Sequence, residues 1–426
     1  MRTPFAFWSG LAVLATSTAS PAQLLSIKPL QVRNDTIVRT VQAPRHTGIA
    51  TLVEEMSIGV ADGDEAYMIG QVSDIALGRD GSLYVFDGQV PVVRHYDASG
   101  KFIGQVGRSG SGPGEYRSAS GVATLPDGRL IVWDTGNWRV NVYAANGHFL
   151  TQWITPSGMS GGGTAQYTRA LMVDSAGRIV TRKQIMNLRD FERQPTIWLR
   201  YRGDGTFLDT LHAPPGPKNL TLRATNGRAS VSNGVPFTPS RYVAASPFGA
   251  LIAGFPNRYA FEIHQPDGRI VSVRRDVRAE PVSRSERSEA RARIEERMRR
   301  TDPTWSWNGP DIPDTKPLYY GLVVGLDGRI WVLLTPEVRT GPGISGSFGS
   351  ARGNSTRIRS PDETEPPKPA LYDVFEPDGT YLGQVQVPAG TYALAHRGDR
   401  VWGVSVGEDD VPRVKRYRIE WTGNRE

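Results

Sequence analysis

The chain has 426 residues, a formal net charge of +7 and no cysteine. The lack of cysteine excludes disulfides, thiolate metal sites and a cysteine nucleophile. The positive charge is small for this length and no recognition motif accompanies it, so we expect no nucleic-acid partner. A chain of this size can still be one domain if repeated units close on each other.

Residues 1–22 have the features of a secretory signal peptide. Arg2 precedes an apolar run from Phe5 to Ala15, and Ser20-Pro21-Ala22 offers small residues for cleavage. This run is shorter than the roughly 20 apolar residues that span a membrane, and no later stretch reaches that length. We therefore expect a periplasmic or secreted protein with no membrane span and no lipid-anchored cysteine. Residues 23–50 would form an N-terminal lead.

From residue 51 to residue 420 the sequence repeats one unit of four short strands. The turns at Asp80-Gly81 and Ser99-Gly100 have glycines 19 residues apart, and the turns at Asp127-Gly128 and Asn146-Gly147 repeat that spacing. Val, Ile, Trp and Tyr, which favour strands, are frequent between them. The units are expected at about 72–106, 119–153, 168–211, 241–277, 319–387 and 391–420.

The sixth unit contains only three strands, and residues 51–59 are the best candidate for its fourth. Four-stranded sheets repeated around an axis form a β-propeller, and a strand lent from one terminus to the last blade closes the ring. We therefore predict an all-β fold over residues 51–420, a six-bladed β-propeller of four-stranded blades closed by an N-terminal strand.

The segment VWDTGNWRVNVY, residues 132–143, resembles the NHL repeat, and Asp134, Asn137, Arg139 and Tyr143 match its consensus. The resemblance implies a six-bladed β-propeller of the exported bacterial type. For the polar residues of the motif we expect structural roles, with Asp134 capping a turn and Arg139 bonding a neighbouring blade.

The long connections are predicted to gather on one face. Turns from the first to the second strand of a unit, and from the third to the fourth, are uniformly short. Longer segments occur only in the other two kinds of connection, at about 107–118, 155–168, 183–195, 212–240, 278–317 and 336–369. A rigid scaffold with its long loops on one face commonly presents a binding surface there.

Two of these insertions have distinctive compositions. Residues 283–300, within 278–317, read as a helix that Ser283 or Ser285 caps, with Ala290, Ile294 and Met298 on an apolar stripe. This basic helix could pack on the propeller, close over the central channel or dock an acidic partner. Trp305 and Trp307 could cover the channel mouth or fasten the insertion. The Gly-, Ser- and Pro-rich loop at 336–369 is expected to be flexible.

Several exported propellers that resemble this chain are enzymes, but their sites are not evident here. Calcium-dependent lactonases need several converging oxygen ligands, and Asp74 is the only carboxylate expected where the first strands begin. The amidating-lyase type uses a histidine-bound metal, whereas the six histidines here are scattered through the units. We therefore expect no catalytic residue, no metal and no cofactor, with a lactonase-like or amidating-lyase-like enzyme with an atypical site as the alternative.

The same alignment of first strands predicts a ligand site at the channel mouth on the loop-rich face. Guanidiniums beside aromatic rings suit a small anionic or polyhydroxyl ligand, although these arginines could instead brace neighbouring loops. A protein partner on the loop-rich face is the other expectation, and we expect a monomer. The predicted site comprises Asp74, Arg169, Arg241, Tyr242, Tyr320 and Tyr392.

Overall fold

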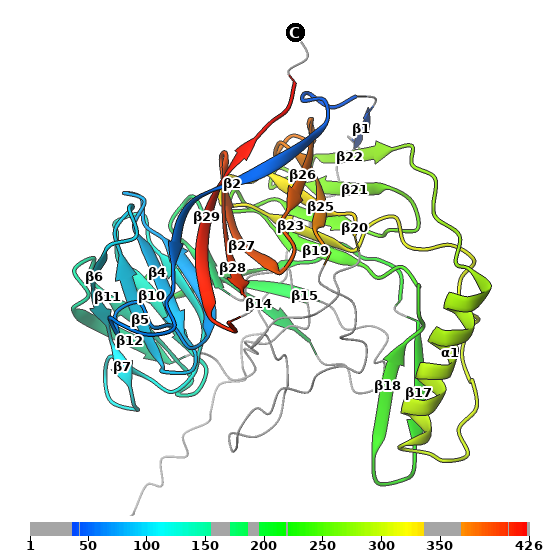
Figure 1. The fold of residues 1–426 in the computed structure, drawn as a ribbon, viewed down its shortest axis with the longest axis horizontal. Helices are drawn as coiled ribbons and strands as arrows, with labels where there is room; N and C mark the ends of the chain where they lie inside the picture. Colours follow the sequence, from blue (N-terminus) through cyan, green and yellow to red (C-terminus); the bar gives the residue numbers. More distant parts are fainter. Residues whose placement is uncertain are drawn as a thin grey trace, which may run out of the picture.

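The computed structural model describes residues 36–41, 43–154, 171–185, 196–218, 220–335, 368–407 and 409–423. The predicted site residue Arg169 and nearly all of the predicted flexible loop at 336–369 lie outside these residues. The described chain is mostly β-structure with one helix (Figure 1). That helix is neither long nor apolar enough to span a membrane.

Four-stranded antiparallel sheets follow one another along the chain, and within each sheet the strands pair in sequence order. Sheet 1 contains β3 (Val72–Leu77), β4 (Leu83–Asp87), β5 (Val92–Tyr96) and β6 (Phe102–Val106). Sheet 2 contains β9 (Ala119–Thr124), β10 (Leu130–Asp134), β11 (Arg139–Tyr143) and β12 (Phe149–Ile154). Sheet 3 contains β13 (Leu171–Val173), β14 (Ile179–Gln184), β15 (Thr196–Tyr201) and β16 (Phe207–His212).

The next sheet has a fifth strand. Sheet 4 contains β19 (Tyr242–Ala245), β20 (Leu251–Gly254), β21 (Ala260–His264) and β22 (Ile270–Arg275). Strand β1 (Thr36–Val41) adds to its outer edge and runs parallel to β22. This strand comes from the predicted N-terminal lead, for which the sequence indicated no strand.

The last seven strands and one strand from near the N-terminus form one continuous eight-stranded sheet with two four-stranded halves. Sheet 5 contains β23 (Gly321–Val324), β24 (Ile330–Leu333), β25 (Ala370–Phe375) and β26 (Tyr381–Val387). Sheet 6 contains β27 (Thr391–Arg397), β28 (Arg400–Val406), β29 (Pro412–Glu420) and β2 (Ile49–Ile58). The start of β2 pairs with β26 at Ile49 and Ala50, which joins the two halves.

Strand β2 reaches the C-terminal end of the fold. It lies antiparallel to β29, in a register that runs from Thr51 opposite Glu420 to Ile58 opposite Val414. The segment that the sequence predicted at residues 51–59 thus pairs with the predicted C-terminal strand, and both are drawn together in Figure 1.

Apolar clusters fill the spaces between consecutive sheets, including the space between sheet 6 and sheet 1. Sheets 1 and 2 bury Phe86 against Val122 and Val132, while sheets 6 and 1 bury Trp402 against Ile75 and Val85. Central strands such as β10 and β11 are buried along their whole length, but the outer strand β12 is largely exposed. Central strands can be apolar on both faces because each face packs on another sheet.

Asp134 and Arg139 of the NHL-like segment hold the connection between sheets 1 and 2. The fully buried Asp134 carboxylate accepts hydrogen bonds from the Ser118 backbone N–H (3.0 Å) and from Asn137 Nδ2 (2.6 Å). Arg139 donates to the carbonyl oxygen of Glu115 at 2.9 Å. Their side chains are thus engaged in holding the scaffold together.

The helix α1 (Arg284–Arg299) matches the predicted segment, with Ser283 as its N-cap and Ala290, Ile294 and Met298 buried. These side chains pack on a hairpin that the sequence analysis did not predict, formed by β17 (Thr221–Thr225) and β18 (Ser230–Gly234). The buried Trp305 fastens the insertion to this hairpin, because its Nε1 donates to the Arg223 carbonyl at 2.6 Å. Helix and hairpin form a lobe beside the sheets (Figure 1).

Candidate ligand-binding cavity

Six tight turns connect the first and second strands of the six sheets. In five of them a backbone N–H donates to the carbonyl four residues later, as Gly78 does to Ser82 at 2.8 Å. The sixth turn is shorter, since Arg397 and Arg400 are directly paired on either side of Gly398 and Asp399. The five longer turns each place a glycine at φ between 75° and 87°, a conformation that glycine adopts without strain, at Gly81, Gly128, Gly177, Gly249 and Gly328.

Each turn contacts the next turn along the chain, and the last turn contacts the first. Hydrogen bonds make four of these contacts: Thr124 Oγ1 to Leu77 O (2.7 Å), Ser175 N to Pro247 O (2.8 Å), Leu326 N to His396 O (2.8 Å) and Arg397 to Gly78 O (3.2 Å). Close packing makes the other two. A Cβ atom at Gly177 would lie 3.3 Å from Pro126 Cγ, and one at Gly328 would lie 2.6 Å from Phe248 Cε2.

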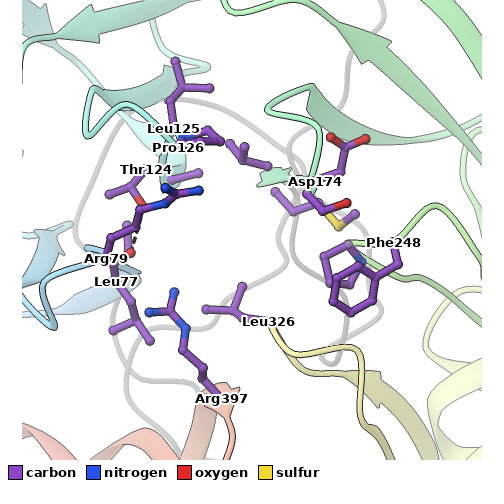
Figure 2. Close-up of a pocket in the computed structure, with 15 residues that line it drawn as sticks. Leu77, Arg79, Thr124, Leu125, Pro126, Asp174, Phe248, Leu326 and Arg397 are labelled. Carbon is purple, nitrogen blue, oxygen red and sulfur yellow. Dashed lines mark hydrogen bonds between the residues drawn. The ribbon is translucent and has the colours of Figure 1, made fainter. Parts of the chain in front are cut away.

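The turns surround a cavity of about 200 Å³, and residues from all six sheets line it. Figure 2 looks into this cavity, with Arg397 and Leu326 pointing toward its middle. The cavity lies where the first strands end. It therefore lies at the opposite end of these strands from the ligand site predicted at their beginnings.

The lining is positively charged. Arg79 is exposed and makes no hydrogen bond or ion pair with any residue that the structure describes. Arg397 is half-buried and donates to the Gly78 carbonyl. The carboxylate in the lining, Asp174, is 4% exposed and already accepts from Arg178 Nε at 2.6 Å. Two cationic side chains therefore face a cavity whose one lining carboxylate is already paired.

Two carboxylates just outside the lining are also paired, each with an arginine of its own turn. Asp127 lies 2.8 Å from Arg129 Nη2, and Asp399 lies 3.2 Å from Arg400 Nη1. Asp80, next to Arg79 in the chain, accepts instead from Ser82 Oγ at 2.6 Å. Because the space is narrow and partly enclosed by apolar side chains, the two guanidiniums act on a bound anion more strongly than exposed arginines would.

Phe248, from the turn of sheet 4, lies across the cavity from Arg79, on the same side as the paired carboxylate Asp174 (Figure 2). Met172, from sheet 3, also lines the cavity. Phe248 is 51% exposed although its turn is otherwise well packed. Its ring rests against Gly328, where a side chain would collide with it. The cavity thus has two arginines on one side and, across from Arg79, an exposed aromatic ring.

The predicted site residues Asp74 and Arg241 have partners within the scaffold. Asp74 accepts a hydrogen bond from the Val122 backbone N–H at 2.9 Å and so links sheets 1 and 2. Arg241 donates to the Pro214 carbonyl, and burial lowers the pKa of its guanidinium. Arg241 thus braces a neighbouring connection, which is the alternative role that we considered for the arginines of the predicted site.

The predicted tyrosines lie at the beginnings of first strands and do not line the cavity. Tyr242 packs near Tyr319, with ring centroids 5.9 Å apart, and burial raises its pKa to about 12. Tyr320 packs on the apolar cluster of sheets 5 and 6, and burial raises its pKa as well. Tyr392 lies in β27, where its carbonyl is close to Gly403. Tyr242 and Tyr320 are near enough to interact, whereas Asp74 and Arg241 make separate contacts.

Sequence reasoning missed the cavity because it treated the short turns as structural. Aligned by their glycines, the turns have Pro126, Ser175, Pro247 and Leu326 at the position that Arg79 occupies in the first turn. The sixth turn is shorter and has no matching position, but it contains Arg397. An arginine at a position that is otherwise small or apolar was the available signal.

No group of three or more His, Asp or Glu side chains that could hold a metal occurs within the described ranges. The histidines there lie in separate places. His396 is buried against Trp331, with ring centroids 4.2 Å apart, and His95 stacks on Tyr84 at 4.0 Å.

No protein-family model matches the chain, and no curated protein matches its sequence. Among solved structures, a member of the DUF4221 family from Bacteroides vulgatus matches with a TM-score of 0.52 at 10% identity, over 89% of this chain and 100% of that one. A Bacteroides fragilis protein described as exported matches with a TM-score of 0.46 at 11% identity, over 90% and 99%. Virginiamycin B lyase from Staphylococcus aureus gives 0.39 at 8%, over 85% and 98%. The described part of the chain thus has a mostly-β fold with one helix, similar to the fold of the DUF4221 member.

Proposed function

We propose that this chain is an exported, six-bladed β-propeller that binds a small anionic ligand in the turn-lined cavity. Sheets 1–6 are its blades, and β2 closes the ring by completing sheet 6. The apolar cluster between sheet 6 and sheet 1 and the cyclic contacts of the turns support this arrangement. The signal-peptide features of residues 1–22 support export.

One observation carries the choice of ligand. Arg79 presents a guanidinium without a partner among the described residues at the edge of a cavity that Arg397 also lines. A guanidinium is an effective donor to carboxylate and phosphate oxygens, and a second one nearby increases its preference for an anion. We place the ligand here because Asp74 and Arg241, on the loop-rich face, already bond the scaffold. The loop-rich face remains our candidate surface for a protein partner.

A thermal-shift experiment with acetate, phosphate and benzoate tests this proposal. A ligand that binds only the folded state raises the melting temperature, by an amount equivalent to about 2.7 kcal/mol at 100 times its Kd. We expect at least one of these anions to stabilise the full chain. In the double variant R79Q/R397Q the anion-induced shift should disappear. The single variant Arg79→Gln should change the ligand-free melting temperature by only a few degrees, because Arg79 has no partner among the described residues, whereas Arg397→Gln also removes the hydrogen bond to the Gly78 carbonyl.

Arg129→Gln is the matched control. Arg129 occupies the turn of sheet 2, but it pairs with Asp127 and does not line the cavity. This variant should keep the full anion-induced shift. The proposal is wrong if no anion stabilises the wild-type chain, or if R79Q/R397Q responds to anions as the wild type does.

A further inference from the structure

We infer that the anion is an aromatic carboxylate of about one ring, held with its carboxylate toward Arg79 and Arg397 and its ring toward Phe248 and Met172. This inference rests on the proposed function and adds a chemical class and an orientation. It depends on three properties of the cavity: its size, its two unlike sides and the exposed ring at one of them.

Size limits the ligand first. The cavity measures about 200 Å³, and an apolar cavity of roughly 150 Å³ is known to accommodate benzene in another protein. Sites for larger, drug-sized molecules usually start at about 300 Å³. The available space therefore suits one ring with one small substituent better than a disaccharide or a nucleotide.

The orientation follows from where the charges lie. Arg79 belongs to the turn of sheet 1 and Arg397 to the adjoining turn of sheet 6, and the hydrogen bond from Arg397 to Gly78 keeps these two turns together. Both arginines thus come from one sector of the ring. A carboxylate can accept parallel hydrogen bonds from a guanidinium, which fixes its plane as well as its position.

The opposite sector offers a surface for a ring. Phe248 leaves about half of its side chain exposed, and it occupies a turn position where sheets 1, 2 and 5 have Asp80, Asp127 and Asp327. Gly328 supports this ring from one side, since any side chain there would collide with it. The thioether of Met172 adds a polarisable wall, and both aromatic rings and sulfur make favourable contacts with an aromatic ligand.

Calorimetric titration of the full chain with benzoate, acetate and benzyl alcohol tests the inference. Benzoate carries both features, acetate lacks the ring, and benzyl alcohol lacks the charge. We expect benzoate to bind at least about tenfold more tightly than either of the others, which corresponds to about 1.4 kcal/mol. Arg397→Gln should weaken benzoate and acetate to a similar extent. Phe248→Ala should weaken benzoate about tenfold and leave acetate within about twofold.

Phe207→Ala is the matched control for Phe248→Ala. Phe207 is also an exposed phenylalanine, at 40% exposure, but it lies in the outer strand β16. This variant should bind benzoate as the wild type does, and its melting temperature should match that of Phe248→Ala within a few degrees.

The outcomes separate this inference from the proposed function. If acetate and benzoate bind equally and Phe248→Ala changes neither, the aromatic class is wrong while an anion site at the arginines stands. If benzyl alcohol binds as tightly as benzoate and Arg397→Gln has no effect, both the inference and the proposed anion site are wrong.

Discussion

The carboxylate of Asp373 joins side chains from sheets 4 and 5. One oxygen accepts from Tyr381 Oη at 2.6 Å and from Gln384 Nε2 at 3.1 Å. The other accepts from Tyr259 Oη and from an Arg275 Nη group. Asp373 is fully buried, and Arg275 also lies over the ring of Tyr381, 4.8 Å from its centroid. A buried carboxylate with this many donors is stable only while all of them remain in place.

Asp373→Asn should therefore destabilise the protein strongly. The amide removes the negative charge that Arg275 faces, and it cannot accept from all four donors. We expect the free energy of unfolding to fall by about 3 to 5 kcal/mol, the range found when one partner of a buried ion pair is removed. Urea unfolding would measure it.

Asp378→Asn provides the comparison. That carboxylate pairs with Arg39 at 3.4 Å on the surface, and its side chain is 57% exposed, so its removal should cost less than about 1 kcal/mol. Equal losses in the two variants would show that the buried network contributes nothing special.

The sequence predicted the structural roles of Asp134 and Arg139 but not the role of Arg79 in the cavity. Asp134 and Arg139 form a local motif whose partners lie within about 30 residues, so the structural roles expected from the motif could be inferred. The role of Arg79 depends on which turns meet around the cavity. Arg397, about 320 residues away, approaches it because the turn of sheet 6 contacts the turn of sheet 1. Local patterns do not contain that information.

Helix α1 depends on Glu286 at its first turn. The Glu286 carboxylate accepts from the Ser283 backbone N–H at 2.9 Å and pairs with Lys316 Nζ at 2.8 Å. The hydrogen bond from Lys316, followed by those from Ser283, lowers the pKa of Glu286 from 4.5 to about 2. A carboxylate also interacts favourably with the N-terminal end of a helix. The ion pair between Glu286 and Lys316 thus links the helix to the segment that leads into sheet 5.

The start of α1 should therefore loosen in acid. Because the folded pKa is below the unfolded one, ionised Glu286 stabilises the lobe fully above about pH 4.5, and this contribution is lost as pH falls toward about 2. Hydrogen exchange of peptides covering 284–299, corrected for intrinsic rates, should show less protection at pH 3 than at pH 6. Glu286→Gln should be less protected at pH 6 and change little with pH.

Glu296→Gln is the control for this titration. Glu296 pairs with Arg300 at 2.7 Å, but both side chains are largely exposed, so this variant should lose protection in acid as the wild type does. Identical pH dependence in the wild type and Glu286→Gln would contradict the assignment.

The helix was predictable because its signals are local: a capping serine, helix-favouring residues and an apolar stripe. The hairpin that it packs on also has a local signal, Asn226-Gly227 between alternating residues, which was passed over inside a long connection. Their association could not be read locally. The hairpin precedes sheet 4 and the helix follows it, so the lobe is built from two insertions that a whole sheet separates in the sequence.

An N-terminal strap, residues 36–58, crosses the outer edges of three sheets in succession. Strand β1 pairs with β22 of sheet 4, and His46 then donates its backbone N–H to the Leu382 carbonyl of sheet 5 at 2.8 Å. Strand β2 completes sheet 6. At a bulge in β2, Glu55 pairs with Arg416 of the adjacent strand β29 (3.0 Å) and with Arg400 of β28 (2.9 Å). Of these contacts, only the pairing of β2 with β29 completes a four-stranded sheet.

Two truncations should therefore behave differently. Removing residues 24–47 deletes β1 and should lower the melting temperature while one cooperative transition remains. Removing residues 24–60 also deletes β2, exposes the edge of β29 and should abolish cooperative unfolding. Scanning calorimetry would compare them. A chain without residues 24–60 that melts as sharply and as hot as the full chain would contradict closure by β2.

At the scale of the whole molecule the repeat spacing carried most of the prediction. A unit with three strands implied a missing fourth, and residues 51–59 were a strand without another partner. The addition of β1 to sheet 4 left no comparable trace, since sheet 4 is complete without it. Whether an extra strand adds to an outer edge depends on which segments lie close together in the folded protein. Composition and repeat spacing therefore do not predict it.

The pairing of β2 with β29 also bears on the order in which the protein can fold. During synthesis β2 is made long before residues 414–420, with which it must pair. The sheet containing both cannot form until nearly the whole described chain has left the ribosome. A contact between segments so distant in sequence has a high entropic cost of loop closure and slows folding. Until then β2 has an open edge, so the nascent chain needs protection from aggregation for most of its synthesis.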